Sequence, residues 1–157
     1  DPRDEGASKS ETDENNQEER IFPFISCGRS TKLGENFGFN SSQYTLFNLN
    51  LVIIEANTIT RWRQELSFGF YRYYYPLKIP KKGEYGLYLR SAQDKVYRIK
   101  WRHKQGFIYD PTYNHCLANY SSEPCFLIVA DIPRQLNWKY HHINNLLHLY
   151  FPPNPVR

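Results

Sequence analysis

Cationic and aromatic side chains alternate through residues 61–104, where the residue types offer the most definite chemistry. Arginine and lysine bind phosphate groups and aromatic rings stack on unpaired bases, so the combination is typical of grooves that bind single-stranded nucleic acid. The candidate residues for such a groove are Arg72, Tyr73, Arg90, Tyr97, Arg98, Lys100, Trp101 and Arg102. A sheet that turns its aromatic residues to a core and its cations to solvent produces the same alternation, and this interpretation stays open.

The histidines and cysteines are poorly spaced for metal binding. The two clusters are His115-Cys116 and His141-His142 with His148. Neither has the CxxC or HExxH spacing that places metal ligands on one face. The sequence also contains no GxSxG motif and no glycine-rich phosphate loop. We therefore expect no metal site and no cofactor.

The three cysteines, Cys27, Cys116 and Cys125, allow one disulfide and one free thiol. A bridge from the start of the domain to the end of its β region would close a long loop and stabilise the fold by about 4–5 kcal/mol. We favour the pair Cys27–Cys125, with Cys116 as the competing partner. Three reduced thiols in a cytosolic protein remain the alternative.

Strands after residue 68 are the main elements expected to position these side chains. Alternating aromatic and aliphatic residues, punctuated by glycine and proline, predict strands over 68–79, 85–90, 95–101, 107–109 and 124–132. Residues 44–59 fit both a helical face and a strand alternation, and their length, with Ser42 as an N-cap, favours a helix. A short helix is expected over 138–151. One main helix packed on a curved antiparallel sheet is an α+β fold.

Residues 1–20 form an acidic tail, with eight acidic residues against three basic ones and no aromatic residue, Leu, Ile or Val. A segment of this composition buries too little apolar surface to fold, so we predict that it is disordered. The formal net charge of +4 therefore conceals a strongly basic domain behind the tail. The tail is either a solubilising leader or a segment that screens the basic domain. No run of about 20 apolar residues occurs, so we expect no membrane-spanning helix.

Four short motifs follow one another in an order that resembles a known family. They read Ile25-Ser26-Cys27-Gly28, Tyr73-Tyr74-Tyr75-Pro76-Leu77, Val96-Tyr97-Arg98-Ile99-Lys100-Trp101 and Gly106-Phe107-Ile108-Tyr109. This order resembles that of the small guanyl-specific fungal ribonucleases, and still more that of the ribonuclease-like secreted effectors of powdery mildew fungi. The resemblance implies a microbial ribonuclease-like α+β domain over 21–125. Residues 126–157 would then be an extension, a strand plus a short helix, packed on the same domain.

The resemblance also implies that catalysis has been lost. The ribonucleases use a Glu two residues before the proline and a His that ends the strand after the arginine. The corresponding positions here are Tyr74 and Asp110, and only the arginine, Arg98, is retained. A phenol is un-ionised at neutral pH, and each lost proton-transfer group costs about 10²–10⁴-fold in rate. We therefore expect no catalytic residues and no enzyme activity.

The function implied by the resemblance is that of a secreted, non-catalytic fungal virulence effector. Such a monomeric protein would act in the host cell and bind host plant proteins, including an intracellular immune receptor, with RNA as a further candidate partner. Two other functions stay open. One is a small secreted β-barrel protein whose aromatic residues line a ligand cavity. The other is an active secreted endoribonuclease, for which the candidate groups are Arg98, Glu65, Glu84, His103 and His115.

Overall fold

The structure, a computed structural model, describes residues 19–40, 42, 46–65 and 69–135. Its elements are β1 (Glu19–Ser26), β2 (Arg29–Ser30), α1 (Lys32–Asn36), β3 (Asn48–Ile54), β4 (Thr58–Ile59), β5 (Phe70–Lys78), β6 (Tyr85–Arg90), β7 (Val96–Lys100), β8 (Phe107–Tyr109), β9 (Asn114–Asn119) and β10 (Cys125–Pro133). Among the described residues, no helix has the length and apolar character needed to cross a bilayer.

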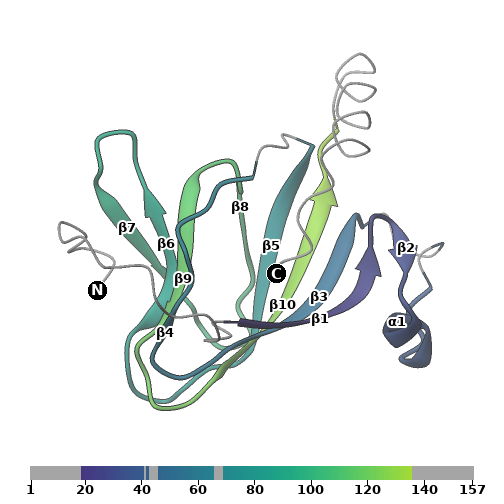
Figure 1. The fold of residues 1–157 in the computed structure, drawn as a ribbon, viewed down its shortest axis with the longest axis horizontal. Coiled ribbons are helices and arrows are strands. Elements are labelled where there is room, and N and C mark those ends of the chain that lie inside the picture. Colours follow the sequence, from purple (N-terminus) through teal and green to yellow (C-terminus); the bar gives the residue numbers. More distant parts are fainter. Residues whose placement is uncertain (1–18, 41, 43–45, 66–68, 136–157) are drawn as a thin grey trace, which may run out of the picture.

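The strands form two antiparallel sheets. The larger sheet has the order β2-β1-β3-β10-β5-β8, and the smaller has the order β4-β9-β6-β7. Figure 1 shows the two sheets as separate layers that face each other, with α1 at the β1–β2 edge of the larger sheet. The described part of the chain is therefore a β-sandwich.

The main core lies between the two sheets. Alternate residues of a strand point to opposite faces, so each sheet sends every second side chain into this layer. Ile54, Tyr74 and Leu127 enter it from the larger sheet, and Leu87 and Trp101 from the smaller one, each at most 1% exposed. Burial of such side chains supplies most of the stability of a sandwich.

The helix expected over residues 44–59 is wrong. Where the structure describes this stretch, it forms strand β3 and the short strand β4. β3 pairs with β1 on one edge and with β10 on the other, and apolar side chains are buried on both of its faces. A strand buried on both faces lacks simple alternation, so its sequence pattern is easily mistaken for that of a helix. Asn57, with φ at +54°, turns the chain between β3 and β4.

The strands predicted beyond residue 68 are confirmed as β5, β6, β7, β8 and β10. Three further strands were not predicted, and one of them is the two-residue strand β2. β1 begins at Glu19, inside the stretch assigned to the acidic tail, and β9 lies between two expected strands. β10 is a central strand of the larger sheet, between β3 and β5, so residues 126–133 form part of the sandwich core. The helix expected over 138–151 and residues 1–18 of the tail lie outside the described residues.

The expected α+β fold class is therefore wrong. The described helix, α1, has five residues, and nearly all the remaining regular structure is antiparallel strand. The predicted Cys27–Cys125 disulfide is also wrong, because all three cysteines are free. Cys27 is exposed in the turn after β1, whereas Cys116 and Cys125 are buried.

Candidate functional site

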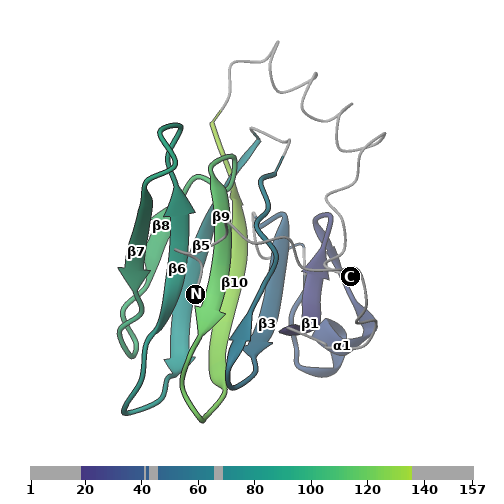
Figure 2. The same ribbon diagram turned by 60° about the vertical axis from the view of Figure 1, so that its left-hand side comes forward.

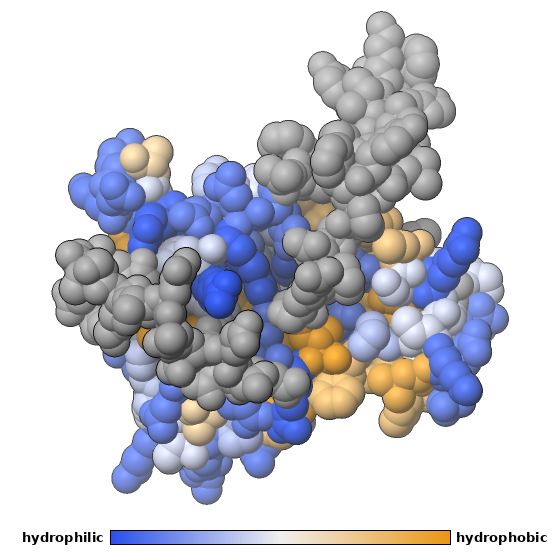
Figure 3. Space-filling view, viewed as in Figure 1, coloured by the Kyte–Doolittle hydropathy of each residue, from blue (hydrophilic) through white to orange (hydrophobic). Residues whose placement is uncertain are grey.

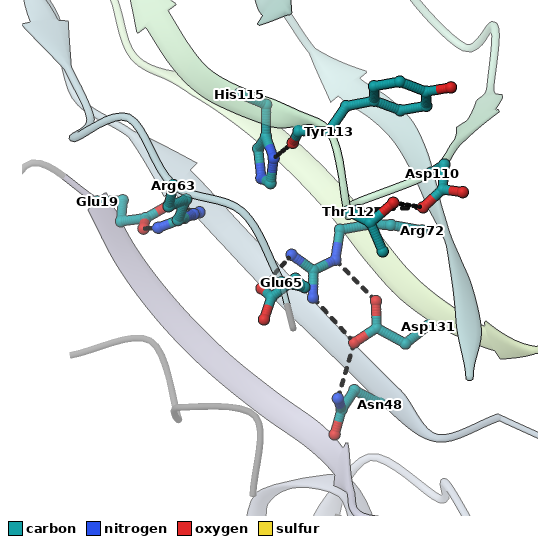
Figure 4. Close-up of polar contacts among 10 residues, drawn as sticks. All are labelled: Glu19, Asn48, Arg63, Glu65, Arg72, Asp110, Thr112, Tyr113, His115 and Asp131. Atoms are coloured by element: carbon teal, nitrogen blue, oxygen red, sulfur yellow. Dashed lines mark hydrogen bonds and ion pairs between the residues drawn. The ribbon is translucent and has the colours of Figure 1, made fainter. Parts of the chain in front are cut away.

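A cluster of charged and polar side chains lies between the two sheets, in the layer that otherwise holds the apolar core (Figure 4). We call it the interior polar cluster. Its members are Glu19, Asn48, Arg63, Glu65, Arg72, Tyr109, His115 and Asp131. Charged groups are rarely buried without a partner, so such a cluster is either a structural network or a binding site.

The register of the larger sheet places Arg72 at the centre of the cluster. On β5 the buried residues are Phe70, Arg72, Tyr74 and Pro76, which is the period of two that turns them toward the smaller sheet. Arg72 is directly opposite Asp131 of β10 on one side and Tyr109 of β8 on the other. The arginine is therefore held between an acid and a phenol by strand pairing alone.

Each of the three nitrogens of the Arg72 guanidinium donates a hydrogen bond to a carboxylate. Its Nε and NH2 atoms donate to the two carboxylate oxygens of Asp131 at 2.7 and 3.1 Å, and its NH1 donates to Glu65 at 3.1 Å. Asn48 donates a further hydrogen bond of 2.7 Å to the Asp131 carboxylate. Burial is the largest single effect and lowers the pKa of Arg72, but the Asp131 carboxylate and the Tyr109 and Tyr74 phenols together raise the pKa well above its usual value.

Arg63 faces Arg72 from the other side of the sandwich. Its backbone exchanges two hydrogen bonds of 2.8 Å with His115 of β9, which extends the smaller sheet by one residue pair. Its NH1 atom donates to Glu19, the first residue of β1, at 2.5 Å. Burial lowers the pKa of Arg63, but the Glu19 carboxylate and the Tyr74 phenol together raise it, so the net shift is upward.

His115 lies in the cluster as a neutral imidazole. Its Nδ1 atom is 2.8 Å from the backbone carbonyl of Tyr113, which can only accept, so Nδ1 carries the proton. Figure 4 shows the ring pointing toward Arg63 and Arg72. Burial is the main cause that lowers the pKa of His115 to about 4, and the two guanidinium groups lower it further. At neutral pH its Nε2 atom is therefore a hydrogen-bond acceptor.

Three polar atoms of the cluster are buried and form no hydrogen bond within the described part of the chain. They are Arg63 Nε, Tyr109 OH and His115 Nε2. The aromatic rings of Tyr109 and His115 meet edge to face with centroids 5.3 Å apart, and the Arg63 guanidinium is close enough to His115 to lower the pKa of the imidazole. Burial, and then the neighbouring Tyr74 phenol, raise the pKa of Tyr109 well above its usual value, so its hydroxyl stays protonated.

The cluster does not have the composition of a metal site. Within the described ranges, no three His, Cys, Asp or Glu side chains come together where they could hold a metal ion. His115, which has the ligand type best suited to a metal, faces two guanidinium groups instead. The second histidine cluster, His141-His142 with His148, lies outside the described residues.

The nucleic-acid candidates from the sequence are spread over the molecule. Arg72 and Trp101 are buried inside the sandwich, and Tyr73 is on the outer face of the larger sheet. The outer side of the smaller sheet and its rim carry the remaining candidates: Arg90, Tyr97, Arg98, Lys100 and Arg102. The structure therefore does not bring these residues into one groove.

The expected catalytic positions are also separated. Tyr74 is in the core, Arg98 is on the outer side of the smaller sheet, and Asp110 pairs with Arg134 at 2.6 Å. Among the groups named for an active ribonuclease, Glu65 and His115 do belong to the interior polar cluster, whereas Glu84 pairs with Arg98 on the outside. No arginine, acid and histidine of that hypothesis share a site.

Sequence reasoning did not name five residues of the cluster as site residues: Glu19, Asn48, Arg63, Tyr109 and Asp131. The available signal was the alternation Phe70, Arg72, Tyr74, which places an arginine on the inward face of a strand. A buried arginine requires an acidic partner, but Asp131 is 59 residues away in the sequence. Only the strand register identifies it.

Comparisons with known proteins bear on the fold. The chain matches no protein-family model, and it matches no curated protein. Oxalate oxidase in complex with glycolate is similar to it in structure, with a TM-score of 0.51 and 12% identity over 80% of this chain and 56% of that one. A second oxalate oxidase structure, with the substrate analogue glycolate, has a TM-score of 0.50 and 13% identity over 81% of this chain and 59% of that one.

A Cupin_2 domain of an XRE-family transcriptional regulator from Enterobacter cloacae is also similar, with a TM-score of 0.48 and 13% identity. The alignment covers 75% of this chain and 100% of that domain. The chain thus spans little more than half the length of the oxalate oxidases but the whole of this domain.

These findings overturn the ribonuclease-like interpretation. The order of short motifs says nothing about which strands pair, and here the Tyr73–Pro76 strand and the Arg98 strand belong to different sheets. The effector and RNA-binding functions rested on that resemblance, and they are therefore wrong as well. The fold gives no information about the expected host partners or the expected secretion. Similarity at this level of identity shows the fold alone, and that fold is an antiparallel β-sandwich like that of the oxalate oxidases.

Proposed function

We propose that this chain is a small-molecule-binding β-sandwich protein and that the interior polar cluster is its ligand site. The observation that carries the proposal is the set of three unpaired atoms, Arg63 Nε, Tyr109 OH and His115 Nε2. More than nine in ten buried polar groups in proteins are hydrogen-bonded, and each unpaired group costs about 1–3 kcal/mol. A ligand that supplies the missing partners recovers this cost on binding.

The three atoms together specify a ligand with hydroxyl groups. His115 Nε2 accepts a hydrogen bond, Arg63 Nε donates one, and Tyr109 OH does either. A hydroxyl group donates and accepts, so neighbouring hydroxyls on one small molecule can satisfy all three. The rings of Tyr74 and Tyr109 stack with centroids 5.6 Å apart, and we propose that the carbon skeleton of the ligand packs against them.

The charges of the cluster favour an uncharged ligand. Arg72 is neutralised by Asp131 and Glu65, and Arg63 is neutralised by Glu19. An anion would therefore have to displace a carboxylate that already forms an ion pair. The oxalate oxidases of similar fold are in complex with glycolate, which carries one hydroxyl and one carboxylate, and we assign only the hydroxyl chemistry to this site.

The protonation states support binding rather than catalysis. A general acid or base works best when its pKa is near the working pH. The pKa of His115 is about 4, and burial raises the pKa values of Tyr74 and Tyr109, so none of these groups exchanges a proton readily at neutral pH. We accordingly propose that the protein is not an enzyme.

A titration of the purified chain with matched small molecules tests the proposal. Ethylene glycol and glycerol should shift NMR signals of residues in the cluster, whereas glycolate, the charged analogue of ethylene glycol, should bind more weakly. Tyr109→Phe removes one hydroxyl partner and keeps the ring, so polyol affinity should fall by about 3–10-fold. Tyr97→Phe changes an exposed tyrosine and should leave it unchanged. Tighter binding of glycolate, or equal affinity in both variants, would contradict the proposal.

A further inference from the structure

The outward side of strands β5, β8 and β10 carries apolar and aromatic side chains. Arg72 and Tyr74 of β5 point between the sheets, so the residues that alternate with them point away from the smaller sheet. Ile108 of β8 is directly opposite Tyr73, and the rings of Tyr73 and Tyr75 stack with centroids 6.4 Å apart. We call this surface the outer apolar face, and we define it by Tyr71, Tyr73, Tyr75, Leu77, Ile108 and Phe126.

The outer apolar face reaches the free edge of the larger sheet at β8, which Figure 2 shows at the opposite end of the sheet from α1. Near α1 the outward side of the sheet is covered, because Leu33 and Phe39 pack there as part of a small second core. In contrast, Tyr71 is 42% exposed, Leu77 is 39% exposed and Ile108 is 58% exposed. Figure 3 shows further hydrophobic surface at the lower side of the larger sheet, below β1 and β3. Contiguous exposed apolar surface of this kind marks an interaction site.

The charges that border this face are cations. Strands β5, β8 and β10 are described throughout, and none of their outward positions holds an acid. The ammonium group of Lys78 lies 5.7 Å from the centre of the Phe126 ring. A turn at 102–105 lies beside the end of β5, because the amide of Lys104 donates to the Pro76 carbonyl at 2.9 Å. Three exposed cations of this border form no ion pair with any residue that the structure describes: Lys78, Arg102 and Lys104.

We propose that the outer apolar face docks on the surface of a lipid bilayer that contains anionic phospholipids. Leu77 and Ile108 enter the boundary between the headgroups and the acyl chains, as the apolar side of an interfacial segment does. Tyrosine rings are favoured at this depth, because one end of the side chain is apolar and the other is polar. Lys78, Arg102 and Lys104 then lie beside the lipid phosphates, which supply the negative charge that this face lacks.

A second copy of the chain is a less complementary partner. In a two-fold dimer the same surface faces itself, so the cations of one copy would meet a face that offers no unpaired acid. Asp110, at the end of β5 where Arg134 lies over the Tyr71 ring, is already paired with that arginine at 2.6 Å. The interior polar cluster lies on the opposite side of the larger sheet, so docking is independent of the ligand site proposed above.

These contacts predict weak, reversible and salt-dependent binding. Each Lys or Arg beside an anionic membrane contributes about fivefold in affinity, so three cations contribute about 100-fold. Transfer of the exposed part of Ile108 out of water adds about tenfold. The contribution of the cations is screened when the Debye length falls well below its physiological value of about 8 Å.

Cosedimentation of the full-length chain with lipid vesicles tests this docking. At about 50 mM NaCl, vesicles of phosphatidylcholine with about 30% phosphatidylserine should bind the chain at least about tenfold more tightly than vesicles of phosphatidylcholine alone. At about 500 mM NaCl, where the Debye length is below about 5 Å, this difference should fall to less than about twofold.

Matched variants make the test specific. Ile108→Ser should weaken binding by about fivefold or more, whereas Tyr97→Ser, at a position of nearly equal exposure on β7 of the smaller sheet, should not change it. Lys78→Gln with Lys104→Gln should weaken binding by at least about tenfold. Arg61→Gln with Lys95→Gln removes two exposed cations next to β4 and β7 of the smaller sheet and should change binding by less than about twofold.

A fluorophore reports which face meets the lipid. An environment-sensitive fluorophore is attached at Ile108→Cys or at Tyr97→Cys in a Cys27→Ser background, since Cys27 is the exposed cysteine and Cys116 and Cys125 are buried. With anionic vesicles, the emission from position 108 should shift to shorter wavelength, and the emission from position 97 should not shift.

Four results would overturn the proposal. The first is equal binding to the two kinds of vesicle at low salt. The second is an equal effect of the two charge variants, which would indicate a response to net charge alone. The third is a shift in emission at position 97 without one at position 108. The fourth is a dimer in sedimentation velocity without vesicles that Ile108→Ser dissociates, which would assign the face to a second copy.

Discussion

The ion pair between Arg72 and Asp131 makes a strong prediction about stability. Asp131 is 2% exposed and Arg72 is 7% exposed, and two hydrogen bonds of 2.7 and 3.1 Å join them. Asp131→Ala removes the carboxylate and leaves a buried guanidinium with Glu65 as its remaining acidic partner. Breaking a buried pair in this way costs about 3–5 kcal/mol, and the remaining Glu65 contact places the expected loss near the lower figure.

Urea unfolding followed by tryptophan fluorescence measures this loss. With a denaturant dependence of about 2 kcal/mol per molar urea, a loss of about 3 kcal/mol lowers the midpoint by about 1.5 M. The matched control is Glu55→Ala, which breaks the pair with Arg20 at the surface, where the side chains are 36% and 48% exposed. Exposed pairs contribute at most about 1 kcal/mol, so this midpoint should move by less than about 0.5 M.

A third variant separates charge from packing. Arg72→Met with Asp131→Leu replaces the pair by apolar side chains, and such replacements of buried pairs are often neutral or stabilising. We expect it to recover most of the stability lost in Asp131→Ala. If Asp131→Ala and Glu55→Ala shift the midpoint equally, Asp131 and Arg72 are solvated, and the reasoning about a dry polar interior is refuted.

Three further predictions concern the pH dependence, the thiols and one buried amide. Because the pKa of His115 is near 6.5 in the unfolded chain and about 4 in the folded protein, the unfolded state binds the proton first as the pH falls. Stability should therefore decrease from pH 6.5 to pH 4 by up to about 3 kcal/mol more than in His115→Gln, as measured by urea unfolding at each pH, and parallel curves for the two proteins would contradict this. A thiol reagent at pH 8 should modify Cys27 alone in the folded protein and all three cysteines in urea. The reason is that Cys116 and Cys125 are buried, and burial raises the pKa of Cys125 to about 12. Rapid reaction of two thiols in the folded state would show that the sandwich opens. Asn119→Ala should lower the free energy of unfolding by at least about 2 kcal/mol, because the two hydrogens of the buried amide are shared among the backbone carbonyls of Ile54, Glu55 and Glu123 and join the end of β3 to the turn before β10. A smaller loss in thermal or urea unfolding would mean that water replaces the amide.

The strands after residue 68 were predictable because their signals are local. β6 and β7 are short segments rich in Tyr, Leu, Val and Ile, and glycines and polar turns separate them from their neighbours. The prediction for β3 was wrong because the sequence of this strand fits two structures. Leu49, Val52, Ile53 and Ile54 are buried on both faces, so their spacing fits a helix as well as a strand. This stretch is a strand because β1 and β10 pair with its two edges, and both lie outside the local sequence from which the prediction was made.

The interior polar cluster was only partly predictable. Arg72 was recognised as a cation but assigned to a surface groove, because its alternation with aromatic residues does not reveal which face is buried. Its partners Asp131 and Tyr109 are set by the register of β10 and β8 against β5. Glu65 and His115 were named as proton-transfer groups. In the structure Glu65 forms an ion pair with Arg72, and His115 is buried and neutral.

The state of the His115 ring tests the central claim most directly. Long-range ¹H–¹⁵N correlation spectra of the imidazole, recorded at pH 6 with and without glycerol, report the protonation of both nitrogens and any hydrogen bond to Nε2. We predict a neutral ring with the proton on Nδ1, and a shift of the Nε2 signal when glycerol binds. A doubly protonated ring, a proton on Nε2, or an Nε2 signal that no polyol shifts would contradict the assignment of the interior polar cluster as a ligand site.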